Sequence, residues 1–533
     1  MNPHKSRIAV AAVSTLVSLS SGVLQAHDTA KLGNVNFPVS CKAEVQPAFN
    51  RAVAILHNFW YPQSLNAFIE IAKADPDCAM AYWGMAMAVR TNPLLGSQPA
   101  PAMKRGWEEI NKAMAASAKS QRERDYIAAL GVYYTDLDKT DYPSRVLAYE
   151  KAMEQLAARY PDDTEAAVFY ALALNEGVTV TPADKTYTRH LKAAGITEKI
   201  LAKQPDHPGA LHYLIHSYDF PGLAKRGVPA ANHYASVAPA APHALHMPSH
   251  IYSMLGMWEE SIKANQESLV VFKGYAHAID FMVYAHLQMG QDREAQRLLE
   301  ASAALQKSGP AAQRTPTGGV FPTYTAYAAI PARYAIERSA WADAAALELK
   351  PTAPAADAIT HFTRAMGYAK LRDTANAGKE IKALQTLREE LLSLKDPYWA
   401  EQVDIQIKAA MAWVAHADGK GTEALKLMRS AADVEDASEK HVAMENRLCP
   451  MRELLGEMLL ELKQPGPALR DFEQSLGEYP NRMRGFYGAA RAAESSGNRQ
   501  KAAEYYKKLV AMTAKADSDK KEIQQAKAFL AAR

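Results

Sequence analysis

Several motifs that define common enzyme classes are missing from this sequence of 533 residues. It contains no Gly-x-Ser-x-Gly nucleophile turn, no phosphate-binding glycine-rich loop, no His-Glu-x-x-His pair and no dinucleotide fingerprint. Each motif places a nucleophile, a phosphate or a metal at a fixed spacing, so its absence removes the usual sequence evidence for that chemistry. We therefore do not expect standard hydrolase or kinase chemistry.

An excess of charge of one sign is also missing, because the formal net charge is only +3. Lys and Arg alternate with Asp and Glu at helical spacings, as in Glu259/Lys263 and Glu504/Lys508. Such pairs are typical of solvated helix faces rather than of a basic stripe, and they argue against nucleic-acid binding. Beyond the first 26 residues no run approaches ~20 uninterrupted apolar residues, so no membrane span is expected.

The first residues have the pattern of a secretory signal peptide. Lys5 and Arg7 precede an apolar stretch from Ile8 to Leu24, which ends in Leu-Gln-Ala before a polar segment. We predict a signal peptide over residues 1–26 and a mature protein that is periplasmic or secreted. Cleavage there would leave His27 at the amino terminus, where its amine and imidazole could chelate copper; a chance histidine is the simpler interpretation.

Cysteine is scarce, with three residues in the chain. Cys41 and Cys78 are close in sequence and could form a disulfide in an oxidising compartment, which would leave Cys449 unpaired. The spacing by itself leaves open whether they do. No Cys-x-x-Cys or haem-attachment motif occurs.

A repeat of 34 residues is clearest near the C-terminus. Ala468 and Phe472 recur as Ala502 and Tyr506, at the period of the tetratricopeptide repeat. Gly456 and Gly488 occupy the position where a small residue lets two helices approach closely. The same helix–turn–helix rhythm continues upstream, and no run shows sustained period-two alternation. The sequence predicts an all-α fold, an α-solenoid of tetratricopeptide-type helix pairs.

Proline- and glycine-rich stretches divide this array. After the signal peptide we expect a first helical array over residues 27–308, with a histidine-rich groove. A loop or joint over residues 309–320 then leads into a second array over residues 321–533.

Several longer motifs extend the resemblance over nearly the whole mature chain. They are Asn36 to Cys41, Arg51 to Tyr61, Asp77 to Met85, and His243 to Ile251 (HALHMPSHI). In these motifs the chain resembles a group of exported bacterial tetratricopeptide repeat proteins. The resemblance implies the fold and export, and it implies no particular reaction.

The repeat period brings histidines into register. A helix predicted from about His243 to Leu255 carries His243, His246 and His250 on one stripe. One period earlier the matching positions are His212 and His216, and one period later they are His277, Asp280 and Tyr284. In tetratricopeptide arrays these positions line the concave groove, so the side chains are predicted to converge there.

Imidazoles together with one carboxylate form a ligand set for transition metals such as zinc, copper or iron. Two histidines four apart on one helix face, as in His212/His216, can clamp a metal ion. The sequence therefore predicts one or two transition-metal ions in the groove. The predicted ligands are His212, His216, His243, His246, His250, His277 and Asp280. An ion with an open position could activate water or dioxygen, with Tyr284 or Asp280 as proton-transfer partner.

Other interpretations of this region stay open. The groove could bind a peptide or envelope protein as a metal-free scaffold, with the histidines adding polarity or pH sensitivity. A small-molecule substrate is also possible, with Arg333 near the groove as an anchor for an anion. Pro248 lies inside the predicted helix and must kink it or begin it late, which would weaken the stripe. His57 is best explained as a packed or hydrogen-bonded residue between helices.

Overall fold

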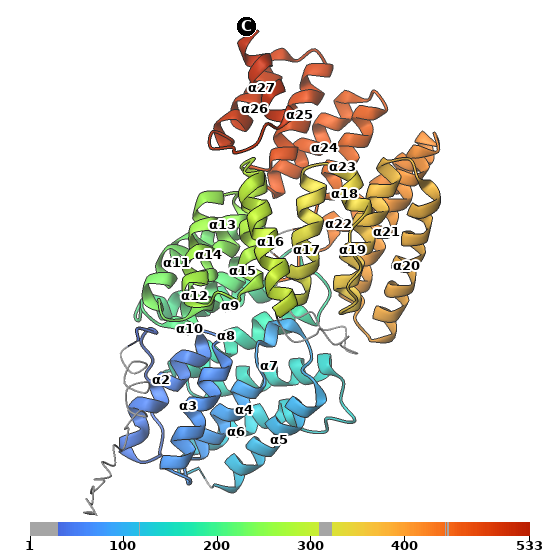
Figure 1. The fold of residues 1–533 in the computed structure, drawn as a ribbon. Coiled ribbons are helices and arrows are strands. Elements are labelled where there is room, and N and C mark those ends of the chain that lie inside the picture. The colour runs from blue at the N-terminus through green and yellow to red at the C-terminus, as the bar shows by residue number, and fades with distance from the viewer. Residues whose placement is uncertain (1–29, 117, 309–321, 443, 445–446, 533) are drawn as a thin grey trace, which may run out of the picture. The chain divides into compact units, whose positions relative to one another are not determined.

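The computed structural model describes residues 30–116, 118–308, 322–442, 444 and 447–532. The described residues form α-helices and two short 3-10 helices, and no strand occurs among them (Figure 1). From Leu32 onward the chain forms one compact unit. The predicted signal peptide, His27 and the predicted joint at residues 309–320 lie outside the described residues.

The helices before residue 309 are as follows. They are η1 (Ala43–Val45), α2 (Gln46–His57), α3 (Tyr61–Ala74), α4 (Ala79–Val89), η2 (Pro93–Leu95), α5 (Ala100–Ala115), α6 (Gln121–Tyr134), α7 (Tyr142–Arg159), α8 (Thr164–Thr179), α9 (Thr188–Leu201), α10 (Pro208–Tyr218), α11 (Ala224–Val237), α12 (Pro242–His246), α13 (Pro248–Met254), α14 (Trp258–Val271), α15 (Ala276–Gln288) and α16 (Asp292–Ser308).

The helices after residue 321 complete the array. They are α17 (Pro322–Glu337), α18 (Trp341–Ala345), α19 (Pro354–Lys370), α20 (Thr374–Ser393), α21 (Pro397–Ala417), α22 (Gly421–Ala437), α23 (Met451–Glu461), α24 (Pro465–Glu478), α25 (Met483–Ser495), α26 (Arg499–Met512) and α27 (Lys521–Ala531).

Each helix from α2 to α27 packs against the next one along the chain. Sequence neighbours are therefore also spatial neighbours, as in an α-solenoid. The predicted all-α solenoid of tetratricopeptide-type helix pairs is confirmed. The described helices include none long and apolar enough to cross a membrane.

The C-terminal repeat has the predicted register. α24 and α26 have the same length, and both their first and their last residues are 34 positions apart. A Cβ atom added to Gly456 or to Gly488 would lie within 2.7 Å of the ring of Phe472. Both glycines are needed because the buried Phe472 ring is wedged between α23 and α25.

The C-terminal helix pairs also contact the middle of the array. The indole Nε1 of Trp258 donates a hydrogen bond to the carbonyl oxygen of Asn481 at 2.8 Å. The fully buried Arg482 donates to the hydroxyl of Tyr284 at 2.8 Å and to Glu337 at 2.7 Å. These contacts fix α25 against α15 and α17.

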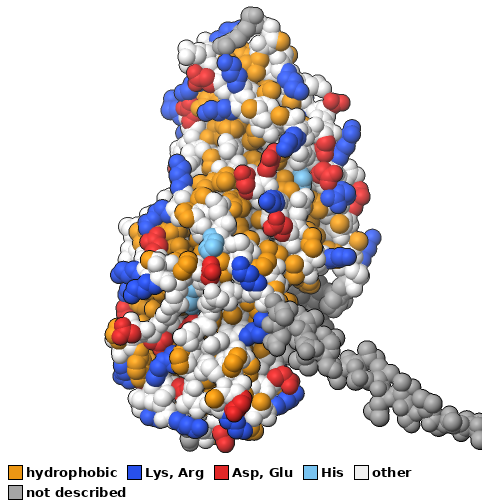
Figure 2. Space-filling model, turned by 90° about the vertical axis from the view of Figure 1, so that its left-hand side faces the viewer, with side chains coloured by type: hydrophobic (Ala, Val, Ile, Leu, Met, Phe, Trp, Pro, Cys, Tyr) orange, Lys and Arg blue, Asp and Glu red, His pale blue; other side chains and the backbone are white. Residues whose placement is uncertain are grey.

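The structure tests the expectations for cysteine pairing and for surface charge. Cys41 and Cys78 form a disulfide, and Cys449 is buried as a free thiol. On the face drawn in Figure 2, basic and acidic side chains are mixed rather than separated. This mixing agrees with the solvated helix faces expected from the alternating charges.

Candidate metal centre

The candidate site is built by helices that begin at the repeat period. α10, α12 and α15 start at residues 208, 242 and 276, at intervals of 34 residues. This register brings the six predicted histidines into two groups. Triad 1 is His212, His216 and His243, and triad 2 is His246, His250 and His277. Within each triad the candidate ligand nitrogens lie within 4.8 Å of one another.

The helix predicted from His243 to Leu255 is interrupted. Pro248 has no N–H to donate back into the preceding turn, so the segment divides into α12 and α13 around Met247. Met247 keeps a right-handed helical conformation, with φ −53° and ψ −35°. The prediction of one continuous helix was wrong, but the helical phase continues through Met247. His243, His246 and His250 therefore still point to one side.

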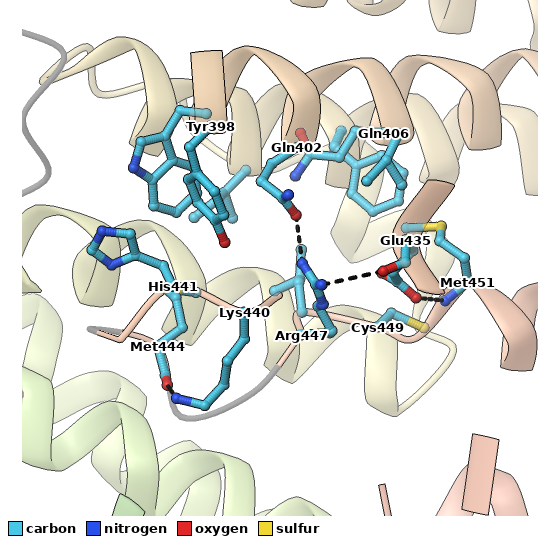
Figure 3. A pocket seen from close by; sticks show the side chains of 15 residues that line it. Tyr398, Gln402, Gln406, Glu435, Lys440, His441, Met444, Arg447, Cys449 and Met451 are labelled. Carbon is cyan, nitrogen blue, oxygen red and sulfur yellow. Dashed lines mark hydrogen bonds between the residues drawn. The ribbon is translucent and has the colours of Figure 1, made fainter. Parts of the chain in front are cut away.

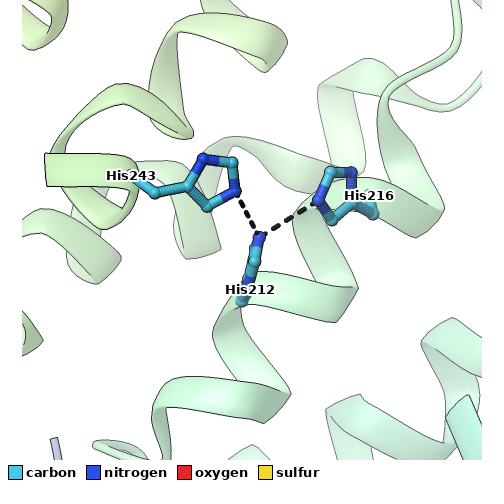
Figure 4. Close-up of side chains that lie close together, drawn as sticks. All are labelled: His212, His216 and His243. Carbon is cyan, nitrogen blue, oxygen red and sulfur yellow. Dashed lines mark hydrogen bonds between the residues drawn. The ribbon is translucent and has the colours of Figure 1, made fainter. Parts of the chain in front are cut away.

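Triad 1 meets through its Nε2 atoms (Figure 4). His212 Nε2 lies 3.0 Å from His216 Nε2 and 3.1 Å from His243 Nε2. The other ring nitrogen of His212, Nδ1, lies 2.7 Å from the carbonyl oxygen of His57. A carbonyl only accepts, so Nδ1 carries the proton and Nε2 presents a bare lone pair to the other two histidines.

Triad 2 has two rings in fixed tautomers. His246 Nδ1 lies 2.6 Å from Asn265 Oδ1, and His250 Nδ1 lies 2.8 Å from Asp219 Oδ2. The Asn265 amide orientation is set because its Nδ2 donates to the Ser261 carbonyl at 2.8 Å. Both Nδ1 atoms are therefore donors, and the unprotonated Nε2 atoms face each other at 3.1 Å.

His277 completes triad 2 from α15. Its ring centroid is 4.6 Å from that of His246 and 5.8 Å from that of His250. His243 is half-buried, and its Nδ1 lies 3.0 Å from the hydroxyl of Tyr275. The other five histidines are buried, so triad 1 has the more exposed member.

Burial keeps these imidazoles neutral. It lowers the pKa of His246 to about 4, although the hydrogen bond to Asn265 opposes this shift. It lowers the pKa of the other five histidines well below the ordinary value, and the neighbouring histidines add to the effect in each case. These rings therefore do not take up a second, charging proton near neutral pH.

This geometry shares one feature with metal-bound histidines. Metal-bound histidines commonly donate their second ring N–H to a carboxylate, amide or carbonyl oxygen, which fixes the tautomer and the ring direction. His212, His246 and His250 each do this, with three different acceptors. Three imidazoles leave a fourth position open on a tetrahedral ion.

Aromatic rings and a distant segment enclose the site. The Phe59 ring lies 4.3 Å from that of His212, and the Phe281 ring lies 4.8 Å from that of His246. Val442, from the segment between α22 and α23, packs on the cluster that contains Phe59. The histidines were predicted to line the concave groove, and five of the six are buried, with aromatic rings packed on them.

Two of the predicted site residues face elsewhere. Asp280 pairs with Arg333, with 3.5 Å between Oδ1 and Nε, and it belongs to neither triad. Burial raises the pKa of Asp280 to about 7, and Arg333 opposes this. Tyr284 receives a hydrogen bond from Arg482 and has the Arg333 guanidinium over its ring. Arg333 therefore serves an internal ion pair.

His57 belongs to a separate buried group, as the packed interpretation predicted. His57 Nε2 and His207 Nε2 lie 2.8 and 3.0 Å from the two oxygens of Glu165. Burial opposes ionisation of Glu165, but His207 and His57 outweigh it and lower its pKa to about 2. All three residues are buried, and the carboxylate satisfies both Nε2 donors.

Sequence reasoning missed the residues that orient the histidines. Asp219 and Asn265 carry no repeat signal, although Asp219 follows His216 by three positions. Lys440, which contacts Asp219, is more than 200 positions away in the chain and has no local signal at all. Only the contacts of the segment between α22 and α23 with the first array, such as Lys185 with Ser438, identify it.

Comparisons with known proteins add little to this geometry. No protein-family model and no curated protein matches the sequence. Solved structures do match, among them "Crystal structure of APC/C hetero-tetramer Cut9-Hcn1". That match is 12% identical, covers 91% of this chain and 83% of that chain, and has a TM-score of 0.38. At these values we draw no inference about function from it.

Proposed function

We propose that this protein binds one or two transition-metal ions through ring nitrogens of triads 1 and 2. The observation that carries the proposal is the pair His246 and His250. Their Nδ1 protons are committed to Asn265 and Asp219, so two lone pairs face each other at 3.1 Å. Lone pairs at this distance repel unless a cation lies between them.

A shared proton is the alternative cation, and burial disfavours it. Charging an imidazole in this environment costs free energy, which is why the pKa of His246 falls to about 4. A metal ion, in contrast, gains several nitrogen ligands at once, and the free energy of coordination offsets the cost of removing the ion from water. Near pH 7 a metal ion is therefore the better occupant.

The ligand atoms favour a borderline metal. Imidazole suits zinc, copper and iron, whereas calcium and magnesium prefer oxygen ligands. The triads supply nitrogen only, and Asp280 is engaged with Arg333. We propose zinc, copper or iron as the resident ion, and whether it is catalytic depends on the open fourth position.

We also propose that the protein works outside the cytoplasm. The disulfide between Cys41 and Cys78 supports this, because such bonds persist mainly in oxidising compartments. The amino-terminal pattern of basic, apolar and small residues supports it independently. Detecting the mature protein in a periplasmic or culture-medium fraction tests this point.

The decisive experiment is elemental analysis by plasma mass spectrometry on protein purified without a His-tag or chelator. We expect stoichiometric zinc, copper or iron in the wild type. His212→Ala/His216→Ala should remove the ion of triad 1, and His246→Ala/His250→Ala that of triad 2. His233→Ala is the matched control, because His233 is 43% exposed and pairs with Asp206 outside both triads.

Two outcomes distinguish a metal-binding protein from a metal-free scaffold. Loss of metal with an unchanged helical circular-dichroism spectrum supports the metal site. Metal-free wild-type protein that takes up no added zinc, copper or iron overturns it. The helical array would then be left as a metal-free scaffold whose partner must be sought by other means.

A further inference from the structure

One lysine from the C-terminal half reaches the histidine site. Lys440 lies between α22 and α23, and its Nζ is 2.7 Å from Asp219 Oδ2. The same ammonium group donates to the carbonyl oxygen of Met444 at 3.0 Å, as Figure 3 shows. Lys440 is 6% exposed, so its charge is buried next to the site.

The two residues before Lys440 are held by hydrogen bonds from three other parts of the chain. The hydroxyl of Tyr398 donates to the carbonyl oxygen of Glu439 at 2.9 Å. Lys185, from the first array, donates to the carbonyl oxygen of Ser438 at 2.8 Å. Arg447 donates to the hydroxyl of Ser438 at 2.8 Å. These bonds position the lysine by the fold rather than by a flexible chain.

Lys440 and His250 share one carboxylate oxygen. Asp219 Oδ2 accepts from Lys440 Nζ at 2.7 Å and from His250 Nδ1 at 2.8 Å. The carboxylate raises the donor strength of His250 toward a metal ion. The ammonium group of Lys440 partly neutralises the same carboxylate and also repels a divalent cation at triad 2. The low dielectric of the buried site strengthens both effects.

We propose that Lys440 is a resident counter-cation that lowers the metal affinity of triad 2 and makes its ion exchangeable. In the absence of metal, the lysine neutralises the buried Asp219, so the site stays assembled. When a metal ion binds, two cations share one carboxylate, which favours release. This inference rests on the proposed metal site, and Lys440 acts as a positioning residue through Asp219.

The test is competitive titration of chelator-stripped protein with zinc. Lys440→Gln should bind zinc at least about tenfold more tightly than the wild type, because a repelling charge is lost. Asp219→Asn should bind about 10- to 100-fold more weakly, because His250 loses its carboxylate. A merely structural contact would predict weaker binding in both variants, so opposite signs distinguish the two roles.

Three further variants secure the result. Lys440→Arg keeps the charge and should stay near the wild-type affinity. Lys185→Met is the matched control, because Lys185 ties the same segment through Ser438 and Glu439 without contacting Asp219. Should Lys440→Gln fail to fold, the charge-balanced double variant Asp219→Asn/Lys440→Gln is compared with Asp219→Asn, and tighter binding is again expected.

The outcomes separate this inference from the metal proposal itself. Zinc binding by the wild type with equal or weaker binding by Lys440→Gln overturns the role of Lys440 and leaves the metal site intact. No zinc binding by any variant, including the wild type, overturns the metal proposal and this inference with it.

Discussion

Two neighbouring groups of buried histidines differ in the partners of their ring nitrogens. In the first, Glu165 lies between His57 and His207, and each ring donates its Nε2 proton to one carboxylate oxygen. His207 Nδ1 accepts from the amide of Ala210 at 3.2 Å, and His57 Nδ1 lies 2.9 Å from the hydroxyl of Tyr213. Every ring nitrogen in this group has a partner within the protein.

The six-histidine group uses the opposite tautomer. His212, His246 and His250 donate from Nδ1 to oxygens at the edge of the group and turn bare Nε2 atoms toward its centre. No carboxylate lies between these nitrogens in either triad. The difference teaches that the group next to Nδ1 decides which nitrogen of a buried histidine faces its neighbours. In the first group the rings face their own anion, whereas the proposed function requires a cation to complete the second.

The largest expected effect comes from a substitution in the group of His57, Glu165 and His207. Glu165→Gln leaves one imidazole N–H facing an amide NH₂, so a buried donor loses its partner. We expect a loss of about 3–5 kcal/mol in the free energy of unfolding, measured by denaturant titration. Glu154→Gln is the control, because this 51% exposed residue pairs with Lys192 and should matter by less than about 1 kcal/mol. Loss of bound metal from Glu165→Gln without loss of stability would make the first group a metal site instead.

The buried His190 lies outside both groups and gives the stability of the protein a pH dependence of its own. Burial lowers the pKa of His190 to about 4, although Asp184 and Asp219 oppose the shift. The unfolded chain then binds more protons, so stability is full above about pH 6.5 and falls until about pH 4. The contribution of His190 is ~3 kcal/mol, from 1.36 kcal/mol per pKa unit. The six site histidines also have lowered pKa values, so His190→Gln should reduce, by the share of one histidine, the fall of the denaturant midpoint over this window. An unchanged pH dependence would contradict the shift.

Zinc should stabilise the protein only by binding to the six-histidine group. At a free concentration 100 times Kd, binding at one site adds about 2.7 kcal/mol to the free energy of unfolding. We expect this gain from thermal or denaturant melts of the wild type. His246→Ala/His250→Ala should lose the share due to triad 2, whereas His233→Ala should keep all of it. Equal stabilisation of all three proteins would place zinc elsewhere.

The smallest expected effect tests whether Asn265 fixes the tautomer of His246. Asn265→Leu removes the acceptor that holds the proton of His246 on Nδ1, so the proton can move to Nε2. Zinc affinity should fall about 10- to 100-fold, which corresponds to about 1.4–2.7 kcal/mol. Calorimetry on folded protein measures this change. An unchanged affinity would show that the acceptor at Nδ1 does not control the ligand.

Much of the fold and part of the site could be predicted from the amino-acid sequence. The 34-residue period predicted helices that begin at matching positions, and α10, α12 and α15 do so. It also predicted which histidines would meet. Asp280 was misplaced because register fixes a position along a helix but does not say which neighbour competes for the side chain. Here Arg333 from α17 takes it.

The sequence by itself determined the helical class, the repeat period and the convergence of six histidines, because these follow from local periodicity. Only the tertiary structure decided the tautomers, the burial of the site and the presence of Lys440. These depend on contacts between residues far apart in the chain, such as His212 with the carbonyl of His57 and Lys440 with Asp219. A repeating pattern specifies which residues are neighbours within the array, whereas the chemistry of this site is set by residues that do not repeat.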